Sequence, residues 1–338
     1  MSHFLSPIFA AGFFESEAVQ IALAVGALVA VVAGVVGVFT VMRGQSFAGE
    51  AFGDLGTTGG AGAYFVGVGP LWGFVLGNVI AAGAMEAIGV QRARGRDLAT
   101  GIVLGAGIGL AALFLHLYTT AHSTTGAIVT ILFGSVFTIS STTIPLILAL
   151  SAVVLAIALT IYRPLLLSSV NAEMAAARGI PVRLVGMLYL LALALAAALA
   201  AITIGTILST ALIVGPAASA LRITRRPLTA LLVAAGIGVA AMWIGIVLAY
   251  DSYYWTPHHT TWPVSFFVVG IVFVVYLLSG LPEDRRSRRA DRTPPASPDR
   301  TPPPGWTPPP DRTPSPSPPV SPPVSPLASS LARPATPS

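Results

Sequence analysis

The sequence contains no cysteine and no lysine among its 338 residues, and all 18 basic residues are arginine. Without cysteine the chain can form no disulfide, hold no thiolate zinc site and use no cysteine nucleophile. Without lysine it has neither the phosphate-binding lysine of a P-loop ATPase nor a Schiff-base lysine. Any reaction that needs ATP hydrolysis of the P-loop type therefore requires a second protein.

Charged residues are also scarce, at 9% of the chain against about 25% in a soluble globular domain. Hydrophobic residues make up 54%, and residues 19–281 are runs of Ala, Val, Leu, Ile and Gly interrupted by short arginine-bearing loops. This composition predicts a multi-pass protein of the cell membrane. Membrane proteins gather basic residues on one side, so the formal charge of +5 does not indicate nucleic-acid binding, and we expect no nucleic-acid partner.

The C-terminal region has a different composition. Residues 290–338 hold 18 of the 28 prolines and repeat the sequence Asp-Arg-Thr-Pro, starting at Asp291, Asp299 and Asp311. Such a segment has too few apolar residues for a packed core, and we predict a solvated, extended tail. We therefore divide the chain into an extracytoplasmic N-terminus (1–18), a transmembrane domain (19–281) and a cytoplasmic, basic and proline-rich disordered tail (282–338).

Nine segments are apolar and close to the length of about 20 residues that crosses the hydrocarbon core. They are 19–42, 47–68, 70–90, 98–120, 143–162, 184–201, 203–221, 228–250 and 263–281. The second is the weakest, because it contains two carboxylates and several glycines. The stretch 126–140 is too short to span, and we expect a re-entrant or interfacial helix covered by protein. The predicted fold class is all-α, with about nine transmembrane helices.

The arginines give the orientation. They follow alternate segments, at Arg43; at Arg92, Arg94 and Arg96; at Arg163, Arg178 and Arg183; at Arg222, Arg225 and Arg226; and at Arg285, Arg286, Arg288 and Arg289. With nine spans, all of these lie on one side of the membrane, and the opposite loops contain no arginine. The positive-inside rule then predicts an N-terminus outside and a C-terminus inside.

Two carboxylates, Glu50 and Asp54, lie inside the second segment, where a charge costs about 2.5–3.5 kcal/mol near the membrane centre. Their spacing of four residues places both on one face of a helix. Like charges so close are stabilised together by sharing a proton or a cation. Two interpretations stay open: a cation site on a translocation path, or an interfacial segment in which both carboxylates meet water or pair with Arg43.

The other ionisable groups near the apolar segments have plainer explanations. Glu86 lies at the inner end of the third segment, where we expect it to form a salt bridge with the arginines from Arg92 onward. His258 and His259 lie in an aromatic-rich outer loop. Adjacent histidines cannot both face one ligand from a helix or strand, so the loop favours an interfacial aromatic belt. A transient metal contact of His258 and His259 at the outer mouth is the alternative.

The loop between the fifth and sixth segments predicts a short cytoplasmic helix. Asn171 is a residue type that caps helix N-termini, Glu173 suits the first turn, and Gly179 ends the helix before Pro181. Such a capped surface helix either contacts a partner or packs on its own protein, and the spacing alone does not choose between these.

Three passages resemble the permease subunits of metal-ion ABC transporters of the zinc and manganese type. Residues 43–54 are similar to that family's basic stretch ending in Gly-Asp-Ala-x-Ser-His, and residues 171–179 to its cytoplasmic Asp-x-Glu-x-Ala-x-x-x-Gly loop. Residues 205–220 are close to its Gly-x-Leu-Leu-x-x-Ala-Leu-Leu-x-x-Pro-Ala-x-x-Ala. The segment Leu132–Ser135 resembles its short Leu-Phe-Gly-Ser helix. The passages occur in the family's order over residues 40–280.

The resemblance implies three partners: a cytoplasmic P-loop ATPase, an extracytoplasmic metal-binding protein and a second permease chain in the membrane lipid. It assigns Asn171, Glu173, Ala175 and Gly179 to the contact with the ATPase. It places the family's metal-handling Asp and His at Glu50 and Asp54. Loss of the histidine leaves two hard oxygen ligands, which suit Mn²⁺ better than the nitrogen-preferring Zn²⁺, although two carboxylates also bind zinc.

The sequence therefore predicts a permease that moves a divalent metal inward when a separate ATPase drives alternating access. We expect no cofactor of its own and no enzymatic activity, because ATP binds to the partner subunit. Two other classes stay open. One is a proton-coupled secondary transporter that uses Glu50 and Asp54 without an ATPase. The other is a siderophore or vitamin B12 type ABC permease, which should be longer.

Overall fold

The computed structural model describes residues 16–88, 96–122, 126–134, 136–224, 226–255 and 262–290. Contacts divide the chain after Arg288, and the helical bundle lies in the first unit. The main helices are α1 (Glu17–Met42), α2 (Ser46–Val66), α3 (Pro70–Ile88), α4 (Arg96–His122), α5 (Gly126–Phe133), α6 (Ile144–Thr160), α7 (Tyr162–Val170), α8 (Ala172–Ala177), α9 (Val182–Ile204), α10 (Thr206–Ile223), α11 (Pro227–Trp255) and α12 (Val264–Ala290). The described residues contain no strand, which confirms the all-α prediction.

Each of the nine predicted segments is a helix in the structure: α1, α2, α3, α4, α6, α9, α10, α11 and α12. Within the described ranges, seven helices are long and apolar enough to cross a membrane, and the apolar part of α12 is the shorter Val264–Gly280. The helix α2 is not among the seven. The chain is thus a polytopic membrane protein, while the count of nine spans and the sides of the termini stay predictions. Beyond the predicted boundary at 281, α12 continues to Ala290.

The helices are apolar on every side, as expected of helices that lie in lipid or deep in a bundle. Large side chains on their outer faces are exposed, such as Leu159 and Ile80 at 71% and Leu232 at 69%. In a membrane these apolar side chains would contact lipid tails instead of water. Because lipid is as apolar as leucine, helix association there depends on close packing between small residues.

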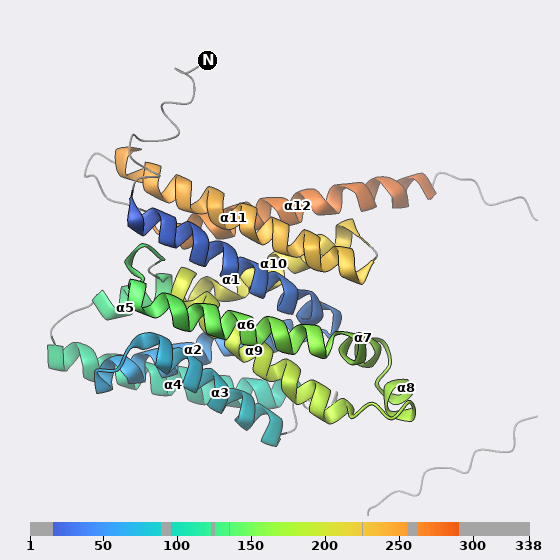
Figure 1. Cartoon of the computed structure of the whole chain (residues 1–338), viewed down its shortest axis with the longest axis horizontal. Coiled ribbons are helices and arrows are strands. Elements are labelled where there is room, and N and C mark those ends of the chain that lie inside the picture. Colours follow the sequence, from blue (N-terminus) through green and yellow to red (C-terminus); the bar gives the residue numbers. More distant parts are fainter. Residues whose placement is uncertain are drawn as a thin grey trace, which may run out of the picture. The chain divides into compact units, whose positions relative to one another are not determined.

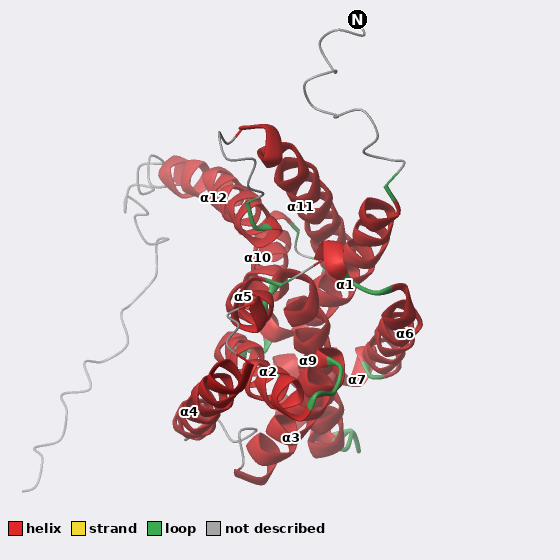
Figure 2. Ribbon diagram, turned by 90° about the vertical axis from the view of Figure 1, so that its left-hand side faces the viewer, coloured by secondary structure: helices red, strands yellow, loops and turns green. Residues whose placement is uncertain are grey.

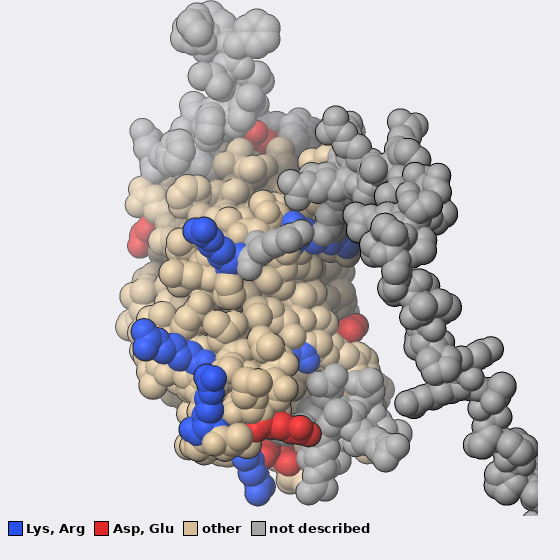
Figure 3. All heavy atoms as spheres, turned by 90° about the vertical axis from the view of Figure 1, so that its right-hand side faces the viewer, with Lys and Arg blue, Asp and Glu red and all other residues tan. Residues whose placement is uncertain are grey.

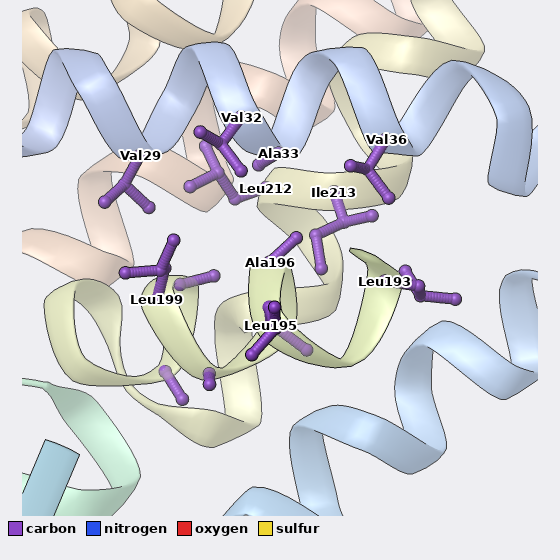
Figure 4. Packing of buried hydrophobic residues seen from close by; sticks show 14 of the residues in the cluster. Val29, Val32, Ala33, Val36, Leu193, Leu195, Ala196, Leu199, Leu212 and Ile213 are labelled. Atoms are coloured by element: carbon purple, nitrogen blue, oxygen red, sulfur yellow. The ribbon is translucent and has the colours of Figure 1, made fainter. Parts of the chain in front are cut away.

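The centre of the bundle follows that principle. Helix α9 lies between the group α2–α4 and the group α1, α10 and α11, as two perpendicular views show (Figures 1 and 2). Its inward positions are largely alanines, which are fully buried from Ala196 to Ala198. Figure 4 shows side chains of α1, among them Val29 and Val32, and Leu212 and Ile213 of α10 above Ala196 and Leu199 of α9.

The stretch predicted to be too short to span breaks into the helix α5 and a 3₁₀ turn at Val136–Thr138. Gly134 ends α5 with a φ of +75°, and Gly205 joins α9 to α10 with a φ of +86°. A Cβ on Gly205 would collide with the carbonyl oxygen of Leu132, so the two backbones cross in close contact. This crossing buries Ile131 of α5, while Val129 and Phe133 stay exposed, so α5 is only partly covered by protein.

Arginines gather at one end of the bundle, where α1 and α10 end and where α7, α8 and α9 meet (Figure 3). Those whose side chains the structure describes include Arg43, Arg163, Arg178, Arg183, Arg222 and Arg226. Glu17 begins α1 at its opposite terminus. The predicted orientation depends on this one-sided distribution of arginines. We call this end of the bundle the arginine end.

Candidate functional site

The candidate site begins where α1 turns into α2. Gly44 has a φ of +62°, a left-handed conformation that glycine adopts without a steric cost, and it reverses the chain within three residues. The backbone N–H of Gln45 then donates to the carbonyl oxygen of Thr40 at 2.9 Å. This tight turn sets Glu50 in the second turn of α2, close to the arginine end.

Three neighbouring helices hold α2 by close contacts. A Cβ on Gly53 would lie 2.6 Å from the Oγ of Ser209, so this side of α2 packs against α10. The hydroxyl of Thr58 donates to the carbonyl oxygen of Gly107 on α4 at 2.7 Å. Gly59 packs against α3. These contacts fix the rotation of α2 about its own axis.

The rotation leaves one face of α2 for the two carboxylates. Each residue of a helix is turned by about 100° from the one before. Glu50, Asp54 and Thr57 therefore point between the directions of Gly53, which faces α10, and Thr58, which faces α4. Glu50 is exposed, whereas Asp54 and Thr57 are partly buried. We call these three residues the carboxylate face.

Two hydroxyls of α10 beside this face already have partners. Ser209 donates its hydroxyl to the carbonyl oxygen of Thr206 at 2.8 Å, and Thr206 donates to that of Ile131 at 3.3 Å. Both side chains are buried and lock α10 to its own first turn and to α5. The ionisable ligands of the face are thus its two carboxylates.

One chain offers an incomplete cation site. Within the described ranges no group of three or more His, Asp or Glu side chains could hold a metal ion. Mn²⁺ and similar hard cations favour oxygen ligands in larger numbers, typically six. Two carboxylates on an open face would bind such a cation firmly only with ligands from water or from another chain.

The interfacial alternative placed Arg43 against the carboxylates, and the structure shows where this side chain lies. Its Nη1 donates to the Oγ of Ser168 on α7 at 3.2 Å, and its guanidinium lies 5.2 Å from the ring centroid of Tyr189 on α9. Arg43 therefore turns toward α7 and α9. Sequence reasoning missed these contacts, because Ser168 and Tyr189 are far from Arg43 in the sequence.

Glu86 forms a salt bridge with an arginine that the sequence had not indicated. Its Oε1 lies 3.3 Å from the Nε of Arg183, at the start of α9. The arginines from Arg92 to Arg94 lie outside the described residues. The structure adds Arg183 as a partner, because α3 packs along α9 and brings two distant parts of the chain together, and the predicted pairing with the arginines from Arg92 onward stays a prediction.

The predicted cytoplasmic helix is α8, and its caps are those expected. The Oδ1 of Asn171 accepts from the backbone N–H of Met174 at 2.9 Å, and Glu173 lies exposed in the first turn. At the other end the N–H groups of Gly179 and Ile180 donate to the carbonyl oxygens of Ala176 and Ala175. This is a Schellman motif, and the φ of +77° at Gly179 is the conformation it requires. The fully buried Ala175 fixes α8 on the protein, and the other positions stay exposed.

The helix α7 before it was not predicted, although its leucines pack against α1 and α9. Nor was a cavity of about 480 Å³ at the opposite end of α2. Its lining includes the hydroxyl-bearing side chains Tyr64, Thr130, Ser140, Thr142 and Thr143. His258 and His259 lie outside the described residues.

Comparison with known proteins gives consistent matches over most of the chain. The sequence model of the ABC 3 transport family matches residues 15–279. The "Manganese transport system membrane protein MntC" of Halalkalibacterium halodurans is 35% identical over 227 residues, which are 67% of this chain and 77% of that protein. The protein of the same name from Listeria monocytogenes is 29% identical over 243 residues, 72% of this chain and 85% of that one.

Among solved structures, "PsaBC from Streptococcus pneumoniae in complex with Fab" contains a chain with a TM-score of 0.71 and 23% identity. The match covers 82% of this chain and 97% of that one. At this identity the likeness concerns the fold, and it places α1–α12 in an architecture that a solved structure also has.

Proposed function

Because the chain belongs to the ABC 3 transport family, we propose that it is the permease subunit of an ATP-driven importer of divalent metal ions, with Mn²⁺ as the preferred substrate. The observation that carries this proposal is the carboxylate face: two acidic side chains one turn apart on a helix of the bundle, turned away from the helices that hold it. The names of the two relatives support manganese as the substrate.

The chemistry of the face favours a hard cation. Two carboxylates repel each other in a medium of low dielectric constant, and a divalent cation between them removes that repulsion. Carboxylate oxygens suit Mn²⁺, whereas Zn²⁺ gains more from nitrogen and sulfur ligands. A substrate path must also bind weakly enough to release the ion, which two oxygen ligands on a partly hydrated face allow.

A second copy of the chain would complete the path. If two copies associate through a two-fold axis that runs between α4 and α10, each contributes its own Glu50 and Asp54. Four carboxylates then surround the axis, which approaches the ligand number of a hexacoordinate cation once water is counted. The exposure of Glu50 in the single chain fits this arrangement.

The energy must come from a partner, since a chain without lysine contains no P-loop ATPase. The exposed positions of α8 at the arginine end are the proposed contact with a cytoplasmic ATPase, and ATP-driven movement there would alternate the access of the carboxylate face. An extracytoplasmic metal-binding protein would deliver the ion at the opposite end, where the hydroxyl-lined cavity opens. The chain itself would cleave no covalent bond.

The decisive experiment separates an ATP-driven importer from a proton-coupled carrier. The chain is reconstituted into liposomes with and without a candidate ATPase encoded beside it, and uptake of ⁵⁴Mn²⁺ is measured with ATP or with a pH gradient. The proposal expects uptake that needs the ATPase and ATP, and no uptake by the chain alone. Uptake by the chain alone, driven by the pH gradient, would replace the proposal with a secondary transporter.

A further inference from the structure

A set of polar contacts at the arginine end joins the three helices α1, α7 and α9. The Nη1 of Arg43, directly after α1, donates to the Oγ of Ser168 on α7, and Ser168 donates in turn to the carbonyl oxygen of Leu165 at 3.0 Å. The hydroxyl of Tyr189 on α9 donates to the Oγ1 of Thr40 on α1 at 2.8 Å, and Thr40 donates to the carbonyl oxygen of Val36 at 3.0 Å.

These contacts lie in an apolar environment, which gives them a defined geometry. Tyr189 is 2% exposed, and Thr40 is fully buried. A buried polar group that loses its hydrogen-bond partner costs about 1–3 kcal/mol. The side chains of this set therefore move together rather than singly, because separate movement would break their hydrogen bonds. The guanidinium of Arg43 both donates to Ser168 and lies over the ring of Tyr189, a combination that the planar fork of arginine favours.

The position of the set connects the two functional parts of the chain. On one side, Ser168 lies near the end of α7, and the chain continues through the cap residue Asn171 into α8. On the other side, Arg43 is followed by the turn at Gly44 and by α2, whose second turn carries Glu50. The contacts of Arg43 therefore connect α7, which leads into α8, with the turn that leads into the carboxylate face.

We propose that Arg43 and Tyr189 are positioning residues that transmit movement of α8 to the start of α2, and so couple ATP hydrolysis to the opening of the carboxylate face. The inference depends on the proposed function, because it assumes that an ATPase binds at α8. When the ATPase moves α8, α7 carries Ser168 with it, and the guanidinium follows between Ser168 and the Tyr189 ring. The turn at Gly44 then converts this displacement into a shift of α2.

The test uses variants that remove the link and leave the helices intact. Arg43→Gln removes the charge and the cation–π contact. Tyr189→Phe keeps the ring beneath Arg43 but removes the hydrogen bond to Thr40. Thr40→Val removes the acceptor of the same hydrogen bond, so it should have the same effect as Tyr189→Phe, which removes the donor. The link is measured as Mn²⁺ transported per ATP hydrolysed in proteoliposomes that contain the complete complex.

We expect Arg43→Gln to lower Mn²⁺ transported per ATP about fivefold or more, within the range of a coupling free energy between two sites. Co-purification with the ATPase and the thermal midpoint should stay close to wild type. Tyr189→Phe and Thr40→Val should each lower the ratio less, and their combination should equal either one alone. An unchanged ratio in Arg43→Gln would overturn the inference, as would hydrolysis and transport that fall together with the amount of folded complex.

A second readout works without transport. Because the chain has no cysteine, the variants Phe47→Cys and Met174→Cys create two unique labelling sites at exposed positions, one at the start of α2 and one on α8. Spin labels at these sites report the distance between the two helices when a nucleotide binds to the ATPase. We expect a nucleotide-dependent change that Arg43→Gln abolishes. If the distance between the two labels changes by the same amount in the wild type and in Arg43→Gln, the inference about Arg43 is refuted, whichever ion is transported. If the complex transports an ion other than Mn²⁺ and Arg43→Gln still abolishes the distance change, only the proposed substrate is refuted.

Discussion

Gly59 of α2 and Gly73 of α3 face each other so closely that a Cβ added to either would collide with the carbonyl oxygen of the other. Gly77 of α3 lies against the same residue of α2 one turn further on. The backbones of α2 and α3 therefore touch without intervening side chains. Such contacts between small residues hold helices together in lipid, where hydrophobic burial supplies no driving force. This contact is what positions the helix that carries Glu50 and Asp54.

A substitution in this contact should separate the helices. Gly73→Ala forces α3 away from Gly59, and we expect a loss of about 1–3 kcal/mol of stability, the usual cost of overpacking. Gly83→Ala on the same helix is the matched control, because a Cβ there meets nothing within 4 Å. Thermal unfolding in detergent measures both variants. Equal midpoints for Gly73→Ala and Gly83→Ala would show that the helices do not approach as described.

Asn78 of α3 is fully buried, and neither of its amide atoms has a hydrogen-bond partner among the described residues. Because such unmade hydrogen bonds cost about 1–3 kcal/mol, Asn78→Leu should raise the free energy of unfolding by an amount of that order. Asn78→Asp, of the same size but charged, should lower it. Denaturation in mixed micelles distinguishes the two. A destabilised Asn78→Leu protein would mean that the amide does have a partner in the working transporter.

The crossing of α5 with the α9–α10 junction should tolerate no side chain at Gly205. A Cβ there collides with the carbonyl oxygen of Leu132, and the φ of +86° is unfavourable for any other residue. We expect Gly205→Ala to cost more than about 2 kcal/mol and to reduce the yield of folded protein. Gly67→Ala also has a positive φ but open surroundings, so its yield should fall less. A similar yield for both would indicate that backbone strain alone matters.

The resemblance to metal-ion ABC permeases aligns Asp54 with a histidine of that family, and we therefore expect position 54 to influence the metal preference. Asp54→His would restore a nitrogen ligand beside Glu50, and nitrogen ligands favour Zn²⁺ over Mn²⁺. We expect ATP-driven uptake to persist while the ratio of Zn²⁺ to Mn²⁺ uptake rises. Competition between ⁵⁴Mn²⁺ and ⁶⁵Zn²⁺ in the same liposomes measures this ratio. If the ratio stays at its wild-type value, position 54 does not contact the ion.

Local features of the fold could be predicted from the sequence. Each long apolar run became a helix, because chain length and composition alone decide that a membrane segment is helical. The caps of α8 followed from Asn171 and Gly179, whose conformational preferences act over a few residues. The placement of Glu50 and Asp54 one turn apart needed only the helical repeat.

Contacts between distant segments could not be predicted in this way. Glu86 pairs with Arg183, and Tyr189 with Thr40, across separations of 97 and 149 residues. Helices that are apolar all round carry no polar stripe to indicate which side turns inward, so their pairing depends on the fit of small residues such as Gly59 and Gly73. The contacts of Arg43 with Ser168 and Tyr189 could therefore be identified only from the structure.

The central claim, that the carboxylate face carries the transported cation, is tested most directly by ATP-driven ⁵⁴Mn²⁺ uptake of the double variant Glu50→Gln and Asp54→Asn. These substitutions keep the size of both side chains and remove only their charge, so assembly with the ATPase should persist. Glu86→Gln, a carboxylate paired with Arg183 away from this face, is the control and should keep most of its uptake. Uptake by the double variant at background level agrees with the account, and uptake at the wild-type rate by an assembled double variant would contradict it.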